Sequence, residues 1–220
     1  PDTLFIDMSS IPPSTARDHH DRLQADGRRY LDAPVSGGTL GAAQATLSIM
    51  AGGAAADFEF AMPLLETLGT PIHIGPVGTG QMTKLANQAI VGITIGAVSE
   101  ALLLATAGGA DPSAVRKALG GGFASSRILE LHGQRMIDRD FLPGATSRVQ
   151  LKDLRTVLST AEQQQLTLPL TEQVFAQYQQ LVENGGEEFD HSALLLQLES
   201  INKPHKVVDA GPELPPLPND

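Results

Sequence analysis

The chain has no cysteine, few aromatic residues and fewer basic than acidic side chains. Its 220 residues include 4% aromatics and 15 Lys and Arg against 25 Asp and Glu, which gives a formal charge of −10. The absence of cysteine excludes disulfides and cysteine-based metal sites and says little about compartment. An acidic chain without a basic run interleaved with aromatic residues has no electrostatic attraction to phosphate backbones, so no nucleic-acid partner is expected.

What the chain does have is enough apolar material for a core. Hydrophobic residues make up 41% of it, and a chain of this length is expected to form one or two domains. No signal-like segment opens the sequence, so a cytoplasmic location is expected. The chain begins at Pro1 and enters an apolar run, Thr3–Ile6, almost at once. This run predicts a buried strand, and we expect an upstream segment to precede it.

The most informative stretch runs from Gly75 to Pro112. Between its glycine-rich ends lie about seven helical turns, which predict one long helix. The middle of this helix, Ala89–Val98, has no charge and carries apolar or small side chains on every face, which predicts a buried core helix. A membrane span needs ~20 apolar residues, and the polar residues of the first turns and Glu100 leave a shorter run, so no membrane partner is expected.

Three polar side chains occupy the first turns of this helix. Lys84, Asn87 and Gln88 stand at positions i, i+3 and i+4 and therefore share one face. Because a lysine is rarely buried without a partner, a lysine entering a core helix suggests a cleft. The alternative is that Lys84 extends to solvent and the amides cap backbone groups, and the spacing alone favours this alternative.

The first third of the chain predicts an α/β arrangement. Strands are expected over Leu4–Asp7, Arg29–Val35, Thr46–Met50 and Pro71–Ile74, with helices after Pro12-Pro13 and over Ala55–Leu68. Ligands bind at the carboxyl ends of strands in such sheets. Ser10 follows the first strand, where ordinary turn chemistry is the alternative. Ser36-Gly37-Gly38 follows the second, and its backbone N–H groups suit a carboxylate unless the glycines form only a flexible turn.

Everything beyond Gly75 predicts helices. The expected later segments are 110–119, 125–137, 149–165, 169–183 and 191–201, with a disordered, proline-rich tail from Lys203. Gly92 and Gly96 stand one turn apart and allow a neighbouring helix to approach closely. Lys152 and Asp153 match an ordinary solvent-facing charge pair. No metal site is expected, since the adjacent histidines at 19 and 20 would point about 100° apart on a helix.

Four motifs in a fixed order carry a resemblance to the β-hydroxyacid dehydrogenases, the family of 3-hydroxyisobutyrate and 6-phosphogluconate dehydrogenases. The run G-x-x-G-x-G-Q-x-x-K-x-x-N, from Gly75 to Asn87, is similar to the catalytic-helix signature of that family. The other motifs are Asp7-Met-Ser-Ser10, Asp32-Ala-Pro-Val-Ser36-Gly37-Gly38 and Lys152-Asp153-Leu154. The match extends to about Asn202. The glycine loop that starts at Gly75 does not have the G-x-G-x-x-G spacing that holds a dinucleotide pyrophosphate.

The resemblance implies an α/β fold: a partial Rossmann-like, doubly wound domain followed by an all-α domain built on a long central helix. It implies the C-terminal part of a Rossmann-like NAD(P)-binding domain over residues 1–79, an all-α substrate and dimerisation domain over 80–203 and a disordered tail over 204–220. The chain would then lack the two or three βα units that bind most of the cofactor, including the position that distinguishes NADH from NADPH.

The resemblance also implies roles for individual residues. Lys84 would be the general acid/base, with Asn87 or Gln88 bonding the substrate. Ser36, Gly37 and Gly38 would bind the substrate carboxylate. The implied cofactor-binding residues are Ser10, against the nicotinamide side, Lys152, which would reach the cofactor, and Asp153, which would also lie near the catalytic lysine. Implied partners are NADH or NADPH, a small hydroxyacid or semialdehyde, and further copies of the chain bound through the helical domain.

Finer features favour one branch of the family. The runs Lys84-Leu-Ala-Asn87-Gln88, Gly121–Ile128 and Asp190–Leu194 resemble the tartronate semialdehyde reductases, also called 2-hydroxy-3-oxopropionate reductases. This resemblance implies NAD(P)H-dependent reduction of a small 3-oxo or semialdehyde acid, above all tartronate semialdehyde to D-glycerate. Two alternatives stay open: a catalytically inactive truncated remnant and a non-enzymatic helical dimerisation module.

Overall fold

The structure, a computed structural model, describes residues 3–214. Contacts divide the chain into two compact units. The first holds the chain up to Gln88 together with 159–165, and the second holds 89–158 and the chain from Leu166 onward. The long helix α4 (Thr79–Ala107) contributes its first turns to the first unit and the rest to the second.

The first unit is built on a five-stranded mixed sheet. Its strands are β1 (Leu4–Asp7), β2 (Arg29–Asp32), β3 (Val35–Ser36), β4 (Leu47–Gly52) and β5 (Gly69–Gly75). β1 runs parallel to β2 and β5 parallel to β4, whereas β2 and β3 both pair antiparallel with β4. The single strand predicted over 29–35 is therefore broken in two. Pro34, which has no N–H to give the ladder, lies at the break.

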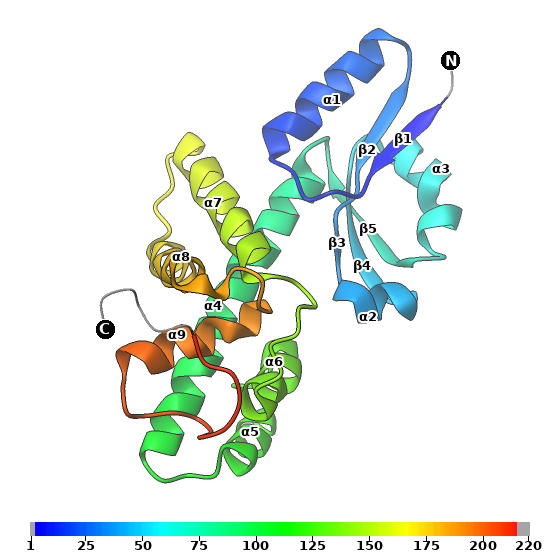
Figure 1. The fold of residues 1–220 in the computed structure, drawn as a ribbon. Coiled ribbons are helices and arrows are strands. Elements are labelled where there is room, and N and C mark those ends of the chain that lie inside the picture. Colours follow the sequence, from blue (N-terminus) through cyan, green and yellow to red (C-terminus); the bar gives the residue numbers. More distant parts are fainter. Residues whose placement is uncertain (1–2, 215–220) are drawn as a thin grey trace. The chain divides into compact units, whose positions relative to one another are not determined.

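Helices cover both faces of this sheet. α1 (Pro13–Ala25) and α3 (Ala55–Leu65) lie on opposite faces in Figure 1. The core includes Leu31, Ile49 and Leu65, each fully buried, and each such side chain contributes about 1.5–3 kcal/mol relative to exposure. The short helix α2 (Gly38–Ala43) occupies a region predicted as a turn. Six residues give too short an apolar pattern to predict a helix.

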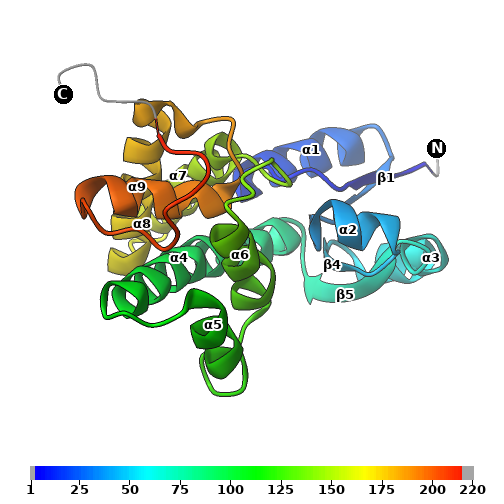
Figure 2. The same cartoon turned by 60° about the horizontal axis from the view of Figure 1, so that its bottom comes forward.

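The second unit is all-helical. Its elements are the rest of α4, α5 (Pro112–Gly120), α6 (Arg127–Asp138), α7 (Ser147–Gln163), α8 (Pro169–Leu181), η1 (Val182–Gly186), η2 (His191–Ala193) and α9 (Leu194–Ile201). The last turn of α7, from Ser159, belongs to the first unit. Figure 2 shows these helices gathered along α4. A Cβ on Gly92 would lie 2.8 Å from Gln150 Nε2 and 3.2 Å from Leu154 on α7. The predicted close approach at this glycine is confirmed, as are the long helix and the two-part fold class.

The surroundings of α4 correct one prediction. Its middle was expected to be buried on every face, but Ile90 is 66% exposed, and further along the helix Leu104 is 77% exposed. The expectation is wrong because the neighbouring helices cover one side of α4 only, and the uncharged side chains on the other side remain at the surface. By length and composition alone α4 could also cross a membrane, with 33% of its most apolar window buried.

The chain after α9 folds back onto the second unit. Arg139, at the C-terminal end of α6, binds both carboxylate oxygens of Glu199 at 3.0 Å and donates to the carbonyl oxygen of Pro212 at 2.7 Å. The backbone N–H of Val207 donates to the same carboxylate, and the Val207 side chain is buried. The segment predicted as disordered thus packs as far as Leu214, and the rest of it lies outside the described residues.

Candidate active site

Asp32 joins the sheet to the first turn of α4. It ends β2 and is completely buried. Its carboxylate accepts the backbone N–H of Gly78 at 2.7 Å and that of Gln81 at 2.8 Å. N–H groups at a helix start have no partner within the helix, and a negative charge there is favourable. Burial raises the pKa of Asp32 above its ordinary value, and the two hydrogen bonds oppose that rise. Asp32 therefore sets the position from which α4 begins.

Gln81 joins the same helix to the loop that follows β1. Its side chain is almost completely buried. The amide nitrogen donates to the carbonyl oxygen of Ser9 at 2.8 Å, and the amide oxygen accepts the N–H of Ile11 at 3.1 Å. Figure 1 shows this loop passing the start of α4. Ser10 lies between the two bonded residues, so its backbone is held on both sides against the catalytic-helix signature.

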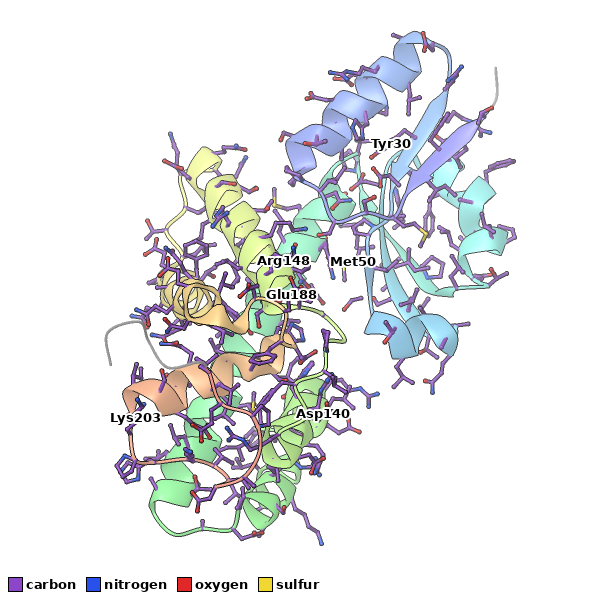
Figure 3. The ribbon with its side chains drawn as sticks, viewed as in Figure 1. Tyr30, Met50, Asp140, Arg148, Glu188 and Lys203 are labelled. Carbon is purple, nitrogen blue, oxygen red and sulfur yellow. The ribbon has the colours of Figure 1, made fainter. Side chains whose placement is uncertain are left out.

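Two glycines permit this close packing. A Cβ on Gly80 would lie 2.3 Å from the carbonyl oxygen of Met50, which is labelled in Figure 3, and 2.7 Å from that of Asp32. A Cβ on Gly52 would lie 2.6 Å from the Asp32 carboxylate and 2.8 Å from the Gly80 nitrogen. The glycine before Gln81 is thus required by contact with the sheet, and any side chain there would displace the start of α4.

The three polar residues of the signature follow on α4. Lys84 lies one turn beyond Gly80 and is partly buried, as are Asn87 and Gln88. The Asn87 side-chain nitrogen donates to the Gln88 side-chain oxygen at 2.8 Å. The predicted helical spacing is confirmed, and the two amides form a linked pair one turn from the lysine. A substrate oxygen could meet an ammonium and amide groups on this one helix.

The loop Ser36-Gly37-Gly38 becomes the start of α2. Gly37 has φ of 142° and Gly38 has φ of 63°, a region that glycine tolerates and other residues avoid. A Cβ on Gly37 would also lie 3.1 Å from a Leu47 methyl group. Both glycines are exposed. The first N–H groups of a helix lack intrahelical partners, so this bend can offer backbone donors to a carboxylate.

Lys152 and Asp153 lie on α7 in the second unit. The Lys152 ammonium is 2.8 Å from an Asp153 carboxylate oxygen. The lysine side chain is 53% exposed, but the aspartate side chain is only 4% exposed. The alternative of a solvent-facing charge pair therefore describes Lys152 and fails for Asp153.

Asp32 and Gln81 belong to the sequence motifs, but the sequence indicated no role for either residue. Arg17 was not predicted as part of the site. The Arg17 guanidinium packs against Gly78: a Cβ on Gly78 would lie 3.0 Å from Arg17 Nε. The positive charge of Arg17 opposes the rise in the pKa of Asp32. Spacing could not reveal the roles of Asp32 and Gln81, because they depend on contacts between segments 46 and 72 residues apart. An aspartate at the end of a buried strand was the one available signal.

A dinucleotide cofactor fits one part of this site. Ser10 sits on a loop that Gln81 fixes beside the start of α4. The sequence contains no G-x-G-x-x-G turn for a pyrophosphate. The residues present could therefore meet a cofactor only through the loops at the start of α4, and not through such a turn.

Comparison with known proteins agrees with this arrangement. Residues 78–198 match the family model described as NAD-binding of NADP-dependent 3-hydroxyisobutyrate dehydrogenase, and residues 1–78 match that of the NAD binding domain of 6-phosphogluconate dehydrogenase. The chain is 51% identical over 196 residues to 2-hydroxy-3-oxopropionate reductase of Escherichia coli, covering 89% of this chain and 67% of that protein. An uncharacterized oxidoreductase of Synechocystis is 41% identical over 89% of this chain and 67% of its own length.

A solved structure shows the same fold. The 3-hydroxyisobutyrate dehydrogenase of Mycobacterium tuberculosis, determined with L-serine, aligns with a TM-score of 0.83 and 31% identity. The alignment covers 90% of this chain and 70% of the other. Across these comparisons the chain spans about two thirds of the length of the proteins it matches. The resemblance predicted from the four motifs is confirmed.

Proposed function

Because the chain belongs to the family of NAD(P)-dependent 3-hydroxyacid dehydrogenases, we propose that it reduces tartronate semialdehyde to D-glycerate. Its similarity to 2-hydroxy-3-oxopropionate reductase of Escherichia coli supports this substrate. The observation that carries the proposal is the double attachment of the α4 start, by Asp32 to the sheet and by Gln81 to the Ser10 loop. It holds Lys84 on a rigid element beside the loops expected to bind ligands.

The proposed mechanism uses groups of the first unit around one carbonyl. Backbone N–H groups of Ser36, Gly37 and Gly38 bind the substrate carboxylate. Asn87 or Gln88, with Asn87 preferred, orients the carbonyl oxygen by hydrogen bonding. Lys84 donates the proton from Nζ to that oxygen as negative charge develops on it. NADH or NADPH supplies the hydride when bound.

The proposal extends to the cofactor contacts and the setting. Ser10, Lys152 and Asp153 are the proposed cofactor-binding residues, and Asp153 is also proposed to act near the catalytic lysine. We propose a cytoplasmic protein with no nucleic-acid or membrane partner. Copies of the chain are proposed to associate through the helical unit, where the exposed apolar side chains of Ile90 and Leu104 would be covered.

The test is a titration of the purified chain with NADH and NADPH, followed by cofactor fluorescence and repeated with tartronate semialdehyde. Cofactor oxidation is expected. Lys84→Ala should lower kcat by about 10²–10⁴-fold, since it removes the proton donor, while substrate binding changes little. Lys117→Ala, which removes an exposed lysine on α5, is the matched control and should leave both values unchanged.

Other outcomes would contradict the proposal. Full activity in Lys84→Ala would rule out its role as the acid. A folded chain that binds neither cofactor would identify an inactive remnant if it also lacks turnover with every oxoacid tested. A monodisperse oligomer without cofactor binding would instead favour the helical dimerisation module.

A further inference from the structure

Two histidines of the second unit face each other at a site separate from the signature residues. His132 lies on α6, and His191 begins η2. Their Nε2 atoms are 3.3 Å apart, and the rings stand at 82° with centroids 4.6 Å apart. The His191 residue is 8% exposed and the His132 side chain 16% exposed. The pair is therefore buried but reachable from solvent on the His132 side.

The other nitrogen of each ring faces an oxygen. Nδ1 of His132 lies 3.6 Å from Asp190 Oδ1, which is an ion-pair contact longer than a hydrogen bond, and Nδ1 of His191 lies within hydrogen-bond distance of the Gln150 side-chain oxygen, at 3.4 Å. A carboxylate oxygen and an amide oxygen can only accept hydrogen bonds. The Asp190 and Gln150 oxygens therefore both favour a proton on the Nδ1 atom that faces them. Each Nε2 then carries a lone pair. Two lone pairs facing each other at this distance repel unless a cation lies between them.

Asp190 itself is fully engaged. Its Oδ1 accepts from the hydroxyl and N–H of Ser192, and its Oδ2 accepts from Arg135 at 3.2 Å and the Gly144 N–H at 3.0 Å. Asp190 is therefore suited to orient His132 from outside a metal's own ligand set, as carboxylates do for many zinc-bound histidines.

The segment that carries His191 is also held in place. Arg148 at the start of α7 pairs with Glu188 at 2.9 Å, and the two are labelled together in Figure 3. The Ser147 N–H donates to the carbonyl oxygen of Phe189 at 2.8 Å, and the buried Tyr178 hydroxyl donates to that of His191 at 2.8 Å. The position of the His191 ring is thus prepared before any ligand arrives.

We propose that His132 and His191 bind one divalent transition-metal ion of the Zn²⁺ type between their Nε2 atoms, with water completing the coordination. Two nitrogens at Zn–N distances of 2.0–2.1 Å in a tetrahedral site lie about 3.3–3.4 Å apart, which matches the separation here. The ligand atoms of His132, His191 and Asp190 all lie within 4.8 Å of one another. Such an ion would fasten α6 to the segment before α9, independently of the proposed reductase function.

The experiment is calorimetric titration of the metal-stripped full chain with ZnCl₂, together with the visible absorption spectrum after addition of Co²⁺. Saturable binding of one ion is expected, with a rise in Tm. His132→Gln should weaken binding at least tenfold and abolish the rise in Tm, because one of two protein ligands is lost. A chain with both His19→Gln and His20→Gln is the matched control and should bind like the original.

Two results would overturn the proposal: no Zn²⁺ binding by the original chain, or Zn²⁺ binding by a folded His132→Gln variant with unchanged affinity. A measurement on the original chain does not depend on the variants folding. Nitrogen-15 NMR of the imidazoles should show both Nε2 resonances shift on Zn²⁺ addition. An Nε2–H proton on His191 that Zn²⁺ does not displace would identify an uncharged hydrogen-bonded pair, with the Gln150 amide turned the other way.

Discussion

A single buried carboxylate, Asp32, accepts two backbone N–H groups from the start of α4. Asp32→Asn would replace one acceptor oxygen by an NH₂ group that faces an N–H, leaving at least one buried donor unpaired. We expect a loss of about 1–3 kcal/mol in the free energy of unfolding, measured with urea. Asp18→Asn, the same change at an exposed site on α1, should cost almost nothing. Equal stability of the two variants would show that Asp32 does not hold the helix.

Asp7, at the end of β1, carries a pH dependence of opposite sign to that of Asp32. Burial raises the pKa of its carboxyl, but hydrogen bonds from Ser9 and the Tyr30 hydroxyl lower that pKa by more than burial raises it, so the net shift is downward. A lowered folded-state pKa contributes stability above the unfolded pKa of about 3.9, and this contribution is lost as pH falls through the folded value.

Asp7→Asn should therefore be about 1 kcal/mol less stable than the original chain at pH 7. The difference should shrink below about pH 4, where the original carboxyl also becomes neutral. Urea unfolding of both chains at several pH values between 3 and 7 measures it. A difference that stays constant over this range would mean that the Asp7 charge contributes nothing.

At the scale of elements, the Gln81 side chain on α4 holds the loop after β1 by two hydrogen bonds. If Ser10 contacts the cofactor as proposed, Gln81→Met should weaken NADH binding about tenfold, since two hydrogen bonds that fix the loop are lost. Fluorescence titration measures the Kd. Gln24→Met on the exposed part of α1 is the matched control. An unchanged Kd in a folded Gln81 variant would separate the loop from cofactor binding.

Sequence patterns predicted most elements because the decisive information was local. The apolar run of β1 and the glycine-bounded length of α4 each lie within one segment, so their existence and bounds were confirmed. The predicted burial of β1 is wrong: Phe5 is 39% exposed, and β1 lies at the edge of the sheet with β2 as its neighbour. The break in the second strand and the helix α2 were missed, because a proline and two glycines were the only cues and each fits several local structures. The motif resemblance was confirmed for a related reason, since each of the four motifs is a short run of residues and their order can be read along the chain.

What the sequence left out depends on contacts between distant segments. Nothing near Asp32 shows that its carboxylate meets N–H groups 46 and 49 residues away. The same holds for His132 and His191, which are 59 residues apart. The exposure of Ile90 was mispredicted because an uncharged stretch does not distinguish burial within one chain from an apolar surface. The roles of Lys84, Ser36 and the other site residues stay predictions.

For the whole molecule, the exposed apolar side of α4 predicts association. Ile90→Glu combined with Leu104→Glu should convert an oligomer to monomers, because burying two carboxylates in an apolar interface is unfavourable. Light scattering after size-exclusion chromatography measures the mass. Leu142→Glu, at a residue in a loop that is as exposed as Leu104, should leave the mass unchanged. A monomeric original chain would contradict the proposed assembly through α4.

The contacts of Arg139 and Glu199 also determine how far the chain can be shortened from its C-terminal end. Arg139 and Glu199 are each 5% exposed, and backbone groups of Val207 and Pro212 add hydrogen bonds to this ion pair. Removing those groups would leave buried charges without their partners. A chain that a protease or an engineered stop codon ends after Pro212 would therefore keep these hydrogen bonds. A chain that ends before Val207 would lose them, and its helical unit would unfold.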